Sequence, residues 1–268
     1  MNSPILSRGD HWFSVLTAHG KHHQVECASV KVADVIIDGQ SIRYIAVVPD
    51  SNNPYPRAKH GEVGLIEGWT LAKIVNETLA EDADKSEKRA IVAIIDVPSQ
   101  AYGRREEAFG IHQALAGAVA AYANARLAGH PVIGLIVGKA MSGAFLAHGY
   151  QANRLIAFND PEVLVHAMGK AAAARITLRS VEALEKLATS IPPMAYDIQN
   201  YRSLGLLEQL LNMPETPSGS KEDTGLVEQA IMNGITESRK YGERLVNRLH
   251  AKNRSSSLLV RERMRAEW

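Results

Sequence analysis

Two turns rich in small and polar residues each follow an apolar run of strand length, and both could present unpaired backbone N–H groups. The run Pro131–Val137 leads into Gly138–Ala144, and the run Ala90–Val97 leads into a second turn that ends at Gly103. A strand that ends in a glycine turn and re-enters a helix leaves N–H groups without partners. Prearranged donors of this kind stabilise a thioester or carboxylate oxygen that becomes negatively charged. The pattern therefore predicts an oxyanion-stabilising site.

The relative position of the two turns decides whether they form such a site. Ligands of open parallel sheets bind beyond the carboxyl ends of neighbouring strands, so two such turns side by side would make one pocket. The alternative is that both are ordinary strand-to-helix loops whose glycines allow close packing. The residues alone leave both interpretations open.

The elements that would position these turns alternate between strand and helix. Asp38-Gly39 separates two β-rich runs within Val30–Val48, which predicts a hairpin because this pair tolerates positive φ. An amphipathic helix is expected at Glu62–Leu79, with Leu65, Trp69, Ala72 and Val75 on one side, and a second helix at about Arg104–Leu127. Shorter strands are expected at Arg154–Phe158 and Val163–Val165. This alternation predicts an α/β fold with parallel strands and right-handed crossovers.

The C-terminal part is expected to be helical. The segment SVEALEKLA begins with a serine cap at Ser180, and a further helix is predicted over Met194–Leu211. A surface loop is predicted at Asn212–Asp223. A long final helix is expected over about Thr224–Lys252, with apolar residues Leu226, Ala230, Ile231 and Ile235, before sixteen charged and frayed residues.

Composition limits the classes of function. The chain has 268 residues, 46% of them hydrophobic, which suits one domain over residues 1–268. A formal net charge of +1 favours neither nucleic acid nor an anionic membrane. The only cysteine, Cys27, excludes an internal disulfide and cysteine clusters. The start MNSPILSRGDHW lacks signal-peptide features, so a cytoplasmic protein is expected.

The two turns and the segment that follows them resemble a known family. DVPSQAYGRREEAFGIHQALA, PVIGLIVGKAMSGAFLA and NRLIAFNDPEVLVHAMGKAAA are similar to carboxyltransferase subunits of the crotonase superfamily, relatives of acetyl-CoA carboxylase. The resemblance extends from the N-terminal hairpin to the C-terminal helix and implies a crotonase-like (ClpP/crotonase) fold. Ser99, Lys139 and Ala144 depart from the family's usual glycine, acidic residue and glycine. Ala144 keeps a backbone N–H, whereas Ser99 and Lys139 argue against biotin handling.

The departures fit the biotin-independent branch of this family, which decarboxylates malonyl thioesters. The resemblance implies a homologous beta-type partner that binds the thioester, an acyl carrier protein with a phosphoribosyl-dephospho-CoA arm, and an acyl-transferring alpha subunit. It implies no cofactor on this chain and an enolate intermediate after loss of CO2. Residues 224–268 are expected at a subunit interface.

The resemblance also suggests roles for particular residues. The Gly143 and Ala144 amides are the expected catalytic donors, with Ser99 and Gln100 opposite them. The expected substrate-binding residues are Met141, Ser142, Gly103, Arg104 and His166. Whether the amides hold the enolate oxygen or the departing carboxylate stays open.

Two other classes of function compete with this interpretation. Ser142 and His166 lie 24 positions apart and, with a carboxylate, could form the triad of a ClpP-like serine hydrolase. Alternatively, the chain is a structural subunit that completes a partner's site without contributing a donor.

Three groups of charged or metal-binding side chains have a weaker signal. His19, His22 and His23 could hold a metal, but Gly20 lies among them, so a solvated loop or interface patch is favoured and no metal is expected. The sequence Arg104-Arg105-Glu106-Glu107 fits a capped surface turn or a docking site for the carrier arm equally well. Arg57, Lys59 and His60 are a second candidate docking site for an acidic carrier protein.

Overall fold

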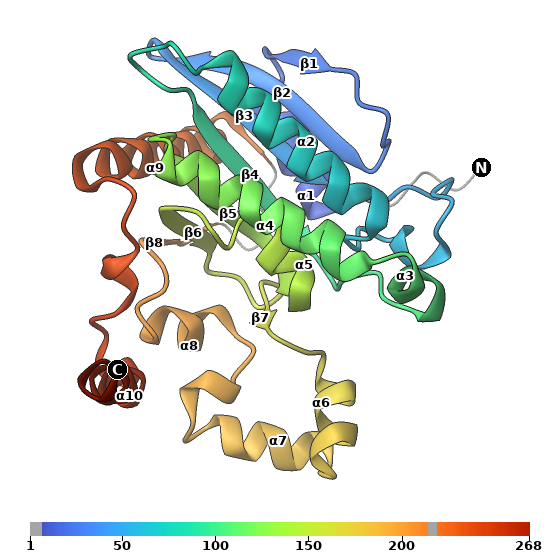
Figure 1. Ribbon diagram of the computed structural model, residues 1–268, viewed down its shortest axis with the longest axis vertical. Helices are drawn as coiled ribbons and strands as arrows, with labels where there is room; N and C mark the ends of the chain where they lie inside the picture. The colour runs from blue at the N-terminus through green and yellow to red at the C-terminus, as the bar shows by residue number, and fades with distance from the viewer. Residues whose placement is uncertain (1–6, 214–218) are drawn as a thin grey trace.

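The computed structural model describes residues 7–213 and 219–268, and the strands within them form one mixed sheet (Figure 1). The order is β1-β2-β3-β4-β5-β6-β8, and β7 pairs with the end of β5. The pairs among β1, β2 and β3 are antiparallel, and the pairs from β3 onward are parallel. The strands are Lys21–His23 (β1), Val30–Ile37 (β2), Gln40–Val47 (β3), Ala90–Val97 (β4), Val132–Met141 (β5), Arg154–Phe158 (β6), Val165–His166 (β7) and Gln209–Leu211 (β8). The predicted α/β class is confirmed.

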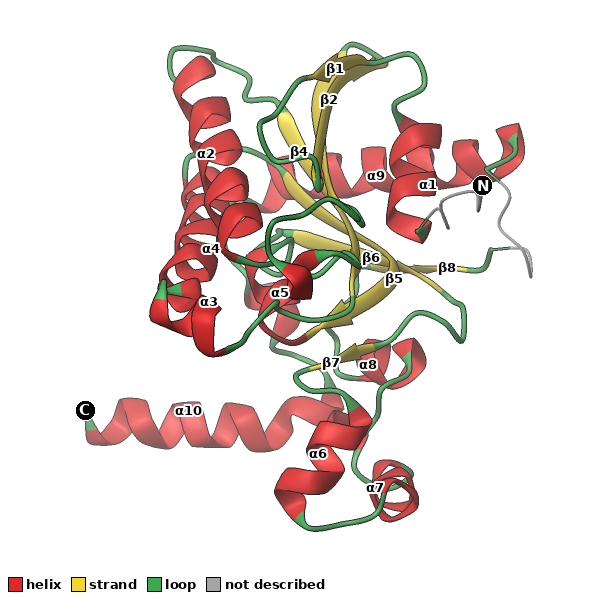
Figure 2. Ribbon diagram, turned by 90° about the vertical axis from the view of Figure 1, so that its right-hand side faces the viewer, coloured by secondary structure: helices red, strands yellow, loops and turns green. Residues whose placement is uncertain are grey.

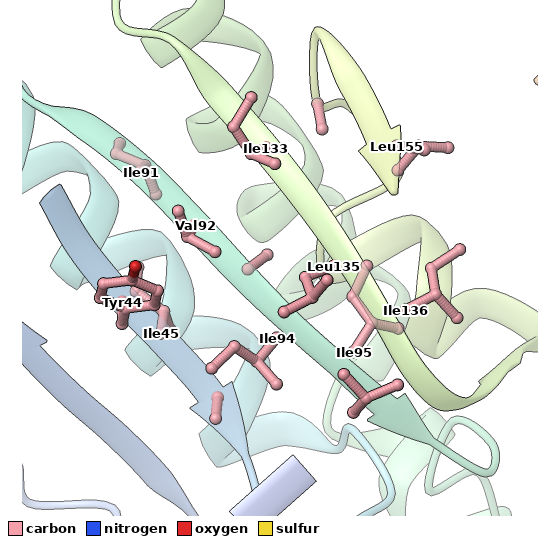
Figure 3. Packing of buried hydrophobic residues seen from close by; sticks show 14 of the residues in the cluster. Tyr44, Ile45, Ile91, Val92, Ile94, Ile95, Ile133, Leu135, Ile136 and Leu155 are labelled. Carbon is pink, nitrogen blue, oxygen red and sulfur yellow. The ribbon is translucent and has the colours of Figure 1, made fainter. Parts of the chain in front are cut away.

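The central strands explain the apolar runs of the sequence. Every residue of β4 except Asp96 is buried, and the isoleucine and valine side chains of β4 and β5 pack on both faces of the sheet (Figure 3). Parallel strands covered on both faces need such continuous apolar runs. The predicted hairpin is also confirmed, since Asp38 (φ 49°) and Gly39 (φ 78°) both have the positive φ of a two-residue turn.

Helices cover both faces of the sheet (Figure 2). The pair α2 (Leu65–Glu81) and α4 (Ile111–Leu127) lies on one face, and α1 (Arg8–Leu16) and α9 (Lys221–Tyr241) lie on the other. Of the residues predicted on one side of the helix at Glu62–Leu79, Leu65, Ala72 and Val75 are buried, whereas Trp69 is 52% exposed and lies over Gly117 of α4. The expected helix 104–127 is two helices, α3 (Arg104–Ala108) and α4, because Gly110 between them has a φ of 81°.

The second half of the chain departs most from the predictions. The expected helix 194–211 contains only α8 (Ile198–Ser203) and then β8, because Gly205 (φ 70°) ends the helical turn. The predicted final helix ends early, since Gly242 (φ 71°) terminates α9 at Tyr241. Within it Leu226 is 42% exposed, whereas Val227, Ala230, Ile231 and Ile235 are buried.

The expectation of a frayed end is also wrong, because residues 255–267 form the helix α10 (Ser255–Glu267). The remaining helices are α5 (Ser142–Ala147), α6 (Lys170–Thr177) and α7 (Val181–Ala188), and the 3-10 turns are Pro56–Ala58, Pro192–Met194, Val246–Arg248 and Lys252–Arg254. The predicted serine cap is confirmed, since Ser180 Oγ accepts the N–H of Ala183 at 3.1 Å. Part of the predicted loop 212–223 lies outside the described residues.

Candidate functional site

The carboxyl ends of β4 and β5 lie side by side, as the turns require. The two strands pair in parallel from Ile91 and Val132 onward, and Val97 is opposite Ala140 after a register shift. Asp96, at the end of β4, accepts the N–H of Lys139 at 3.0 Å and the N–H of Gly9 at 3.1 Å. Both turns therefore leave the sheet from one edge, and Asp96 is a structural residue that pattern reasoning missed.

A strained residue joins β5 to α5. Ser142 has a φ of 57°, which is uncommon for a residue with a side chain and often occurs at functional turns. The chain changes direction there, and Gly143 and Ala144 form the first turn of α5. This turn, Met141–Ala144, is called the elbow below.

The elbow faces the turn that follows β4. The Gly143 N–H donates to Gln100 Oε1 at 2.6 Å, so the predicted pairing of these two turns is confirmed. This bond also means that the Gly143 donor already has a partner within the chain. Ala144 is fully buried and follows Gly143 in the first turn of α5.

The remaining predicted residues of the β4 turn have different environments. Ser99 Oγ donates to the Gln100 carbonyl oxygen at 3.0 Å, so Ser99 supports its own turn. Gly103 precedes the first turn of α3, and the Arg57 side chain lies against it. Arg104 is exposed, whereas the Arg105 guanidinium stacks over the ring of Tyr55.

A cavity of about 420 Å³ opens beside the elbow. It is lined by Ser142, Gly143, Phe145, Leu146, Tyr150, Val165, His166, Ala167, Pro192, Pro193, Ala195, Tyr201 and Leu204. These residues include no Asp, Glu, Lys or Arg. The cavity therefore suits an uncharged, largely apolar part of a ligand, with hydrogen bonding concentrated at the elbow.

His166 lines this cavity in a fixed orientation. Its ring stacks on Tyr196 with 3.9 Å between centroids, and its Nδ1 lies 2.9 Å from the Met168 carbonyl oxygen and 3.1 Å from the Met168 nitrogen. Burial lowers the pKa of His166, which favours a neutral ring.

This arrangement does not form the triad of a serine hydrolase. A triad needs the serine on one ring nitrogen and a carboxylate on the other. Nδ1 of His166 lies against backbone atoms, and among the described residues its ring has no hydrogen bond to Ser142.

A buried histidine that the sequence analysis missed holds the other end of α5. His148 Nε2 lies 2.9 Å from the Ile94 carbonyl oxygen of β4, and Nδ1 lies 3.1 Å from the Tyr122 hydroxyl of α4. Burial lowers the pKa of His148 to about 4 and raises the pKa of Tyr122 above its usual range. A neutral ring that donates from Nε2 and accepts at Nδ1 satisfies both contacts.

The N-terminal histidines belong to the edge of the sheet. The segment predicted as a loop forms β1, in which His22 Nε2 lies 3.0 Å from the Thr17 carbonyl oxygen and His23 Nε2 lies 2.8 Å from Asp34 Oδ2. The described residues contain no group of three His, Cys, Asp or Glu side chains arranged to hold a metal. Among the same residues, no helix combines the length and apolar character needed to cross a membrane.

Comparison with known proteins identifies the sequence relatives of this fold. A family model described as malonate decarboxylase gamma subunit (MdcE) matches residues 58–268. The malonyl-S-ACP:biotin-protein carboxyltransferase MADD of Malonomonas rubra is 36% identical over 163 residues, which cover 60% of this chain and 56% of that protein. The chain thus spans little more than half the length of this curated relative.

Solved structures match over almost the whole chain. One subunit of a Pseudomonas malonate decarboxylase hetero-tetramer in complex with coenzyme A is 58% identical, with a TM-score of 0.94, over 98% of this chain and 100% of that chain. A chain of the Pseudomonas MdcD-MdcE hetero-dimer is 55% identical, with a TM-score of 0.90, over 98% and 99%. The transcarboxylase 12S enzyme shares only the fold, at 19% identity and a TM-score of 0.59 over 82% and 41%. The predicted crotonase-like architecture is confirmed.

Proposed function

The chain belongs to the malonate decarboxylase gamma subunit family, and from this membership we propose that it forms one half of a carboxy-lyase that acts on a malonyl thioester. The reaction converts malonyl-S-acyl carrier protein to acetyl-S-acyl carrier protein and CO2. A homologous beta subunit binds the thioester, and this chain faces it across the subunit interface. The Pseudomonas relatives, which were crystallised as hetero-dimers and hetero-tetramers, support this division.

The remaining components of the proposed enzyme complex are inferred from membership in the same family. The acyl group is carried on a phosphoribosyl-dephospho-CoA arm of the carrier protein, and an acyl-transferring alpha subunit loads it. Lys139 and Ser99 replace residues typical of biotin-dependent relatives, so the reaction uses no biotin. The single cysteine, Cys27, favours the cytoplasm as the compartment.

The observation that carries the proposal is the elbow beside an uncharged cavity. Loss of CO2 leaves an enolate, whose oxygen needs hydrogen-bond donors in a site that excludes water. The Ala144 N–H belongs to the first turn of α5, directly after Gly143, which lines the cavity. Ser142 and His166, which line the cavity, then flank the path of the thioester, and the buried Met141 precedes Ser142 in the elbow.

The carrier protein would approach over the exposed basic residues beside the β4 turn. Arg57 lies against Gly103, next to the exposed Arg104, so the two predicted docking sites are one surface. Lys59 and the exposed His60 extend it. An acidic carrier would be steered to such a surface, and charge reversal there should slow association more at low salt than at high salt.

Reconstitution tests the function directly. The chain, its beta-type partner and a malonyl-loaded carrier are combined, and CO2 and acetyl thioester are measured. We expect both subunits to be required. Ala144→Pro removes the N–H and should reduce the rate by about 100-fold or more, whereas Ala144→Gly keeps the N–H and serves as the matched control. A partner that is fully active alone, or an active and correctly assembled Ala144→Pro complex, would contradict the proposal.

A further inference from the structure

Gln100 is fixed by hydrogen bonds on both its backbone and its side chain. Ser99 and Ala101, on either side of Gln100, both pair with Val63. Val63 N donates to the Ser99 carbonyl at 3.1 Å, and Ala101 N donates to the Val63 carbonyl at 2.9 Å. The Gln100 carbonyl oxygen accepts the Tyr102 N–H at 3.0 Å. The side chain therefore extends from a rigid backbone, and Oε1 reaches the Gly143 N–H at 2.6 Å.

The bond to Gly143 determines which end of the carboxamide is available. A carboxamide has one acceptor oxygen and one NH2 group with two donors. Because Oε1 accepts the backbone N–H, Nε2 must be the opposite end of the group. Within the described part of the chain Nε2 donates to no protein atom, and it is not among the buried side-chain atoms that lack a partner. It is thus an oriented and accessible donor.

Glycine at position 143 makes this contact possible. A Cβ atom there would lie 2.4 Å from Gln100 Oε1 and 3.4 Å from a Leu115 methyl carbon. Any side chain would displace the carboxamide from the elbow. The small residue at 143 therefore serves the approach of Gln100 as well as the geometry of the turn.

We infer that Gln100 is a catalytic hydrogen-bond donor of this chain: the Gly143 amide orients its carboxamide, and Gln100 Nε2 donates to the oxygen that becomes anionic. The inference rests on the proposed function. As the bond between the α-carbon and the carboxylate carbon breaks, CO2 leaves and the electron pair passes to the thioester carbonyl. The resulting enolate oxygen accepts from Nε2, and a water molecule then protonates the α-carbon and is left as hydroxide. The Gly143 N–H acts on the side chain and not on the substrate.

Gln100→Glu distinguishes hydrogen-bond donation to the substrate from a purely structural hydrogen bond to the Gly143 N–H. Glutamate has the same size and still offers an oxygen to the Gly143 N–H, but its carboxylate has no donor. We expect kcat to fall by about 100-fold or more, as when one oxyanion donor is removed, while KM for the loaded carrier changes less than about threefold. The ratio of the variant's rate to the wild-type rate should rise as pH falls toward 5, because a protonated carboxyl donates again. Gln113→Glu, at an exposed glutamine of α4, is the control for an added negative charge.

Gln100→Ala tests the opposite interpretation, in which the side chain blocks the Gly143 amide. A blocking side chain predicts a rate equal to or above the wild type, whereas a donor predicts a loss. Co-elution with the beta-type partner and an unchanged melting temperature establish that the variants fold and assemble. Wild-type kcat in Gln100→Glu, or a faster Gln100→Ala complex, would overturn the inference. If Ala144→Pro is inactive while both Gln100 variants are active, the proposed function stands and only this inference falls. If the wild-type complex releases no CO2, the proposed function itself falls.

Discussion

At the scale of single residues, one carboxylate ties together three separate segments near the site. Asp96 accepts backbone N–H groups from Gly9 at the start of α1 and from Lys139 near the end of β5. Gly138 lies directly beneath it, since a Cβ there would come within 2.2 Å of Asp96 Oδ1. The carboxylate therefore sets the separation of the two strand ends from which the elbow and the Gln100 turn extend.

We predict that Asp96→Ala lowers the free energy of unfolding by about 2–3 kcal/mol, because two hydrogen bonds to a charged acceptor are lost. Urea denaturation measures the change, and Asp84→Ala, at an exposed aspartate, should change the free energy of unfolding by no more than about 0.5 kcal/mol.

Gly138→Ala should be destabilising in the wild type and much less so in the Asp96→Ala background, because the clash is with the Asp96 side chain. Additive losses in this double-mutant cycle would refute the explanation.

The buried His148 gives a second prediction, on pH dependence. Its pKa is about 4 when folded, against 6.5 for an unperturbed histidine, because burial disfavours the charged ring. Above pH 6.5 the His148 ring is neutral in both the folded and the unfolded protein. Between pH 6.5 and 4 only the unfolded protein binds a proton at His148, so the free energy of unfolding falls as pH falls. The full effect is about 3 kcal/mol.

Urea unfolding of the wild type and His148→Gln between pH 7.5 and 5 isolates this contribution. His148→Gln should be less stable at pH 7.5, because Gln cannot reproduce both contacts, but its stability should decline less steeply. Burial also lowers the pKa of His130, and this contribution is present in both proteins and cancels. Parallel pH curves for the two proteins would show that His148 titrates normally.

At the scale of elements, the sequence predicts best where a single local signal decides the structure. The bounds of β4 and the Asp38-Gly39 hairpin are correct because an apolar run and a turn pair suffice. A single helix is predicted over Met194–Leu211, yet Gly205 and the pairing of β8 with β6 divide this segment. Such pairing is a tertiary effect that no local pattern contains.

The candidate site was predictable to a similar degree. The turn after β4 could be found by type and spacing, whereas β5 continues to Met141, so the second turn begins later than the predicted Gly138. The family, down to the gamma subunit of malonate decarboxylase, could be found by resemblance. The bond from the Gly143 N–H to Gln100 could not be foreseen, because it depends on the register shift between β4 and β5. The environment of His148 likewise arises only when α4, α5 and β4 pack together.

The contact between α2 and α4 leads to a prediction about glycine. A Cβ at Gly68 would come within 2.8 Å of the backbone carbon and oxygen of Ala114, and backbone atoms cannot move aside as a flexible side chain can. Gly68→Ala should therefore lower the free energy of unfolding by about 1–3 kcal/mol. Gly225→Ala in α9 is the matched control, because nothing lies within 4 Å of its Cβ. It should stabilise the protein by up to about 1 kcal/mol through helix propensity. Equal effects in thermal unfolding would contradict the packing argument.

At the scale of the whole molecule, α10 differs from the other long helices. It extends away from the sheet and contains no buried residue (Figure 2). Leu259, Val260 and Met264 are each about half exposed or more, and Trp268 is fully exposed. A helix that buries no apolar side chain gains little from tertiary packing, so its ordered form favours a role in assembly. Residues 224–268 are expected at a subunit interface, and within them α10 is the part that we expect to contact a partner.

Removal of residues 255–268 tests this role, because α10 contributes no buried side chain to the chain's own core. The melting temperature of the isolated chain should change by less than about 2 °C, since little apolar area is lost. Affinity for the beta-type partner should fall by at least about tenfold, which corresponds to about 1.4 kcal/mol of interface energy.

Val260 and Met264 lie one helical turn apart on one face of α10, and the double variant Val260→Lys with Met264→Lys should also weaken binding. Glu262→Lys, on another face, is the charge control. Size-exclusion chromatography and titration calorimetry measure both effects. If the truncated chain binds its partner as tightly as the full chain, α10 lies outside the interface.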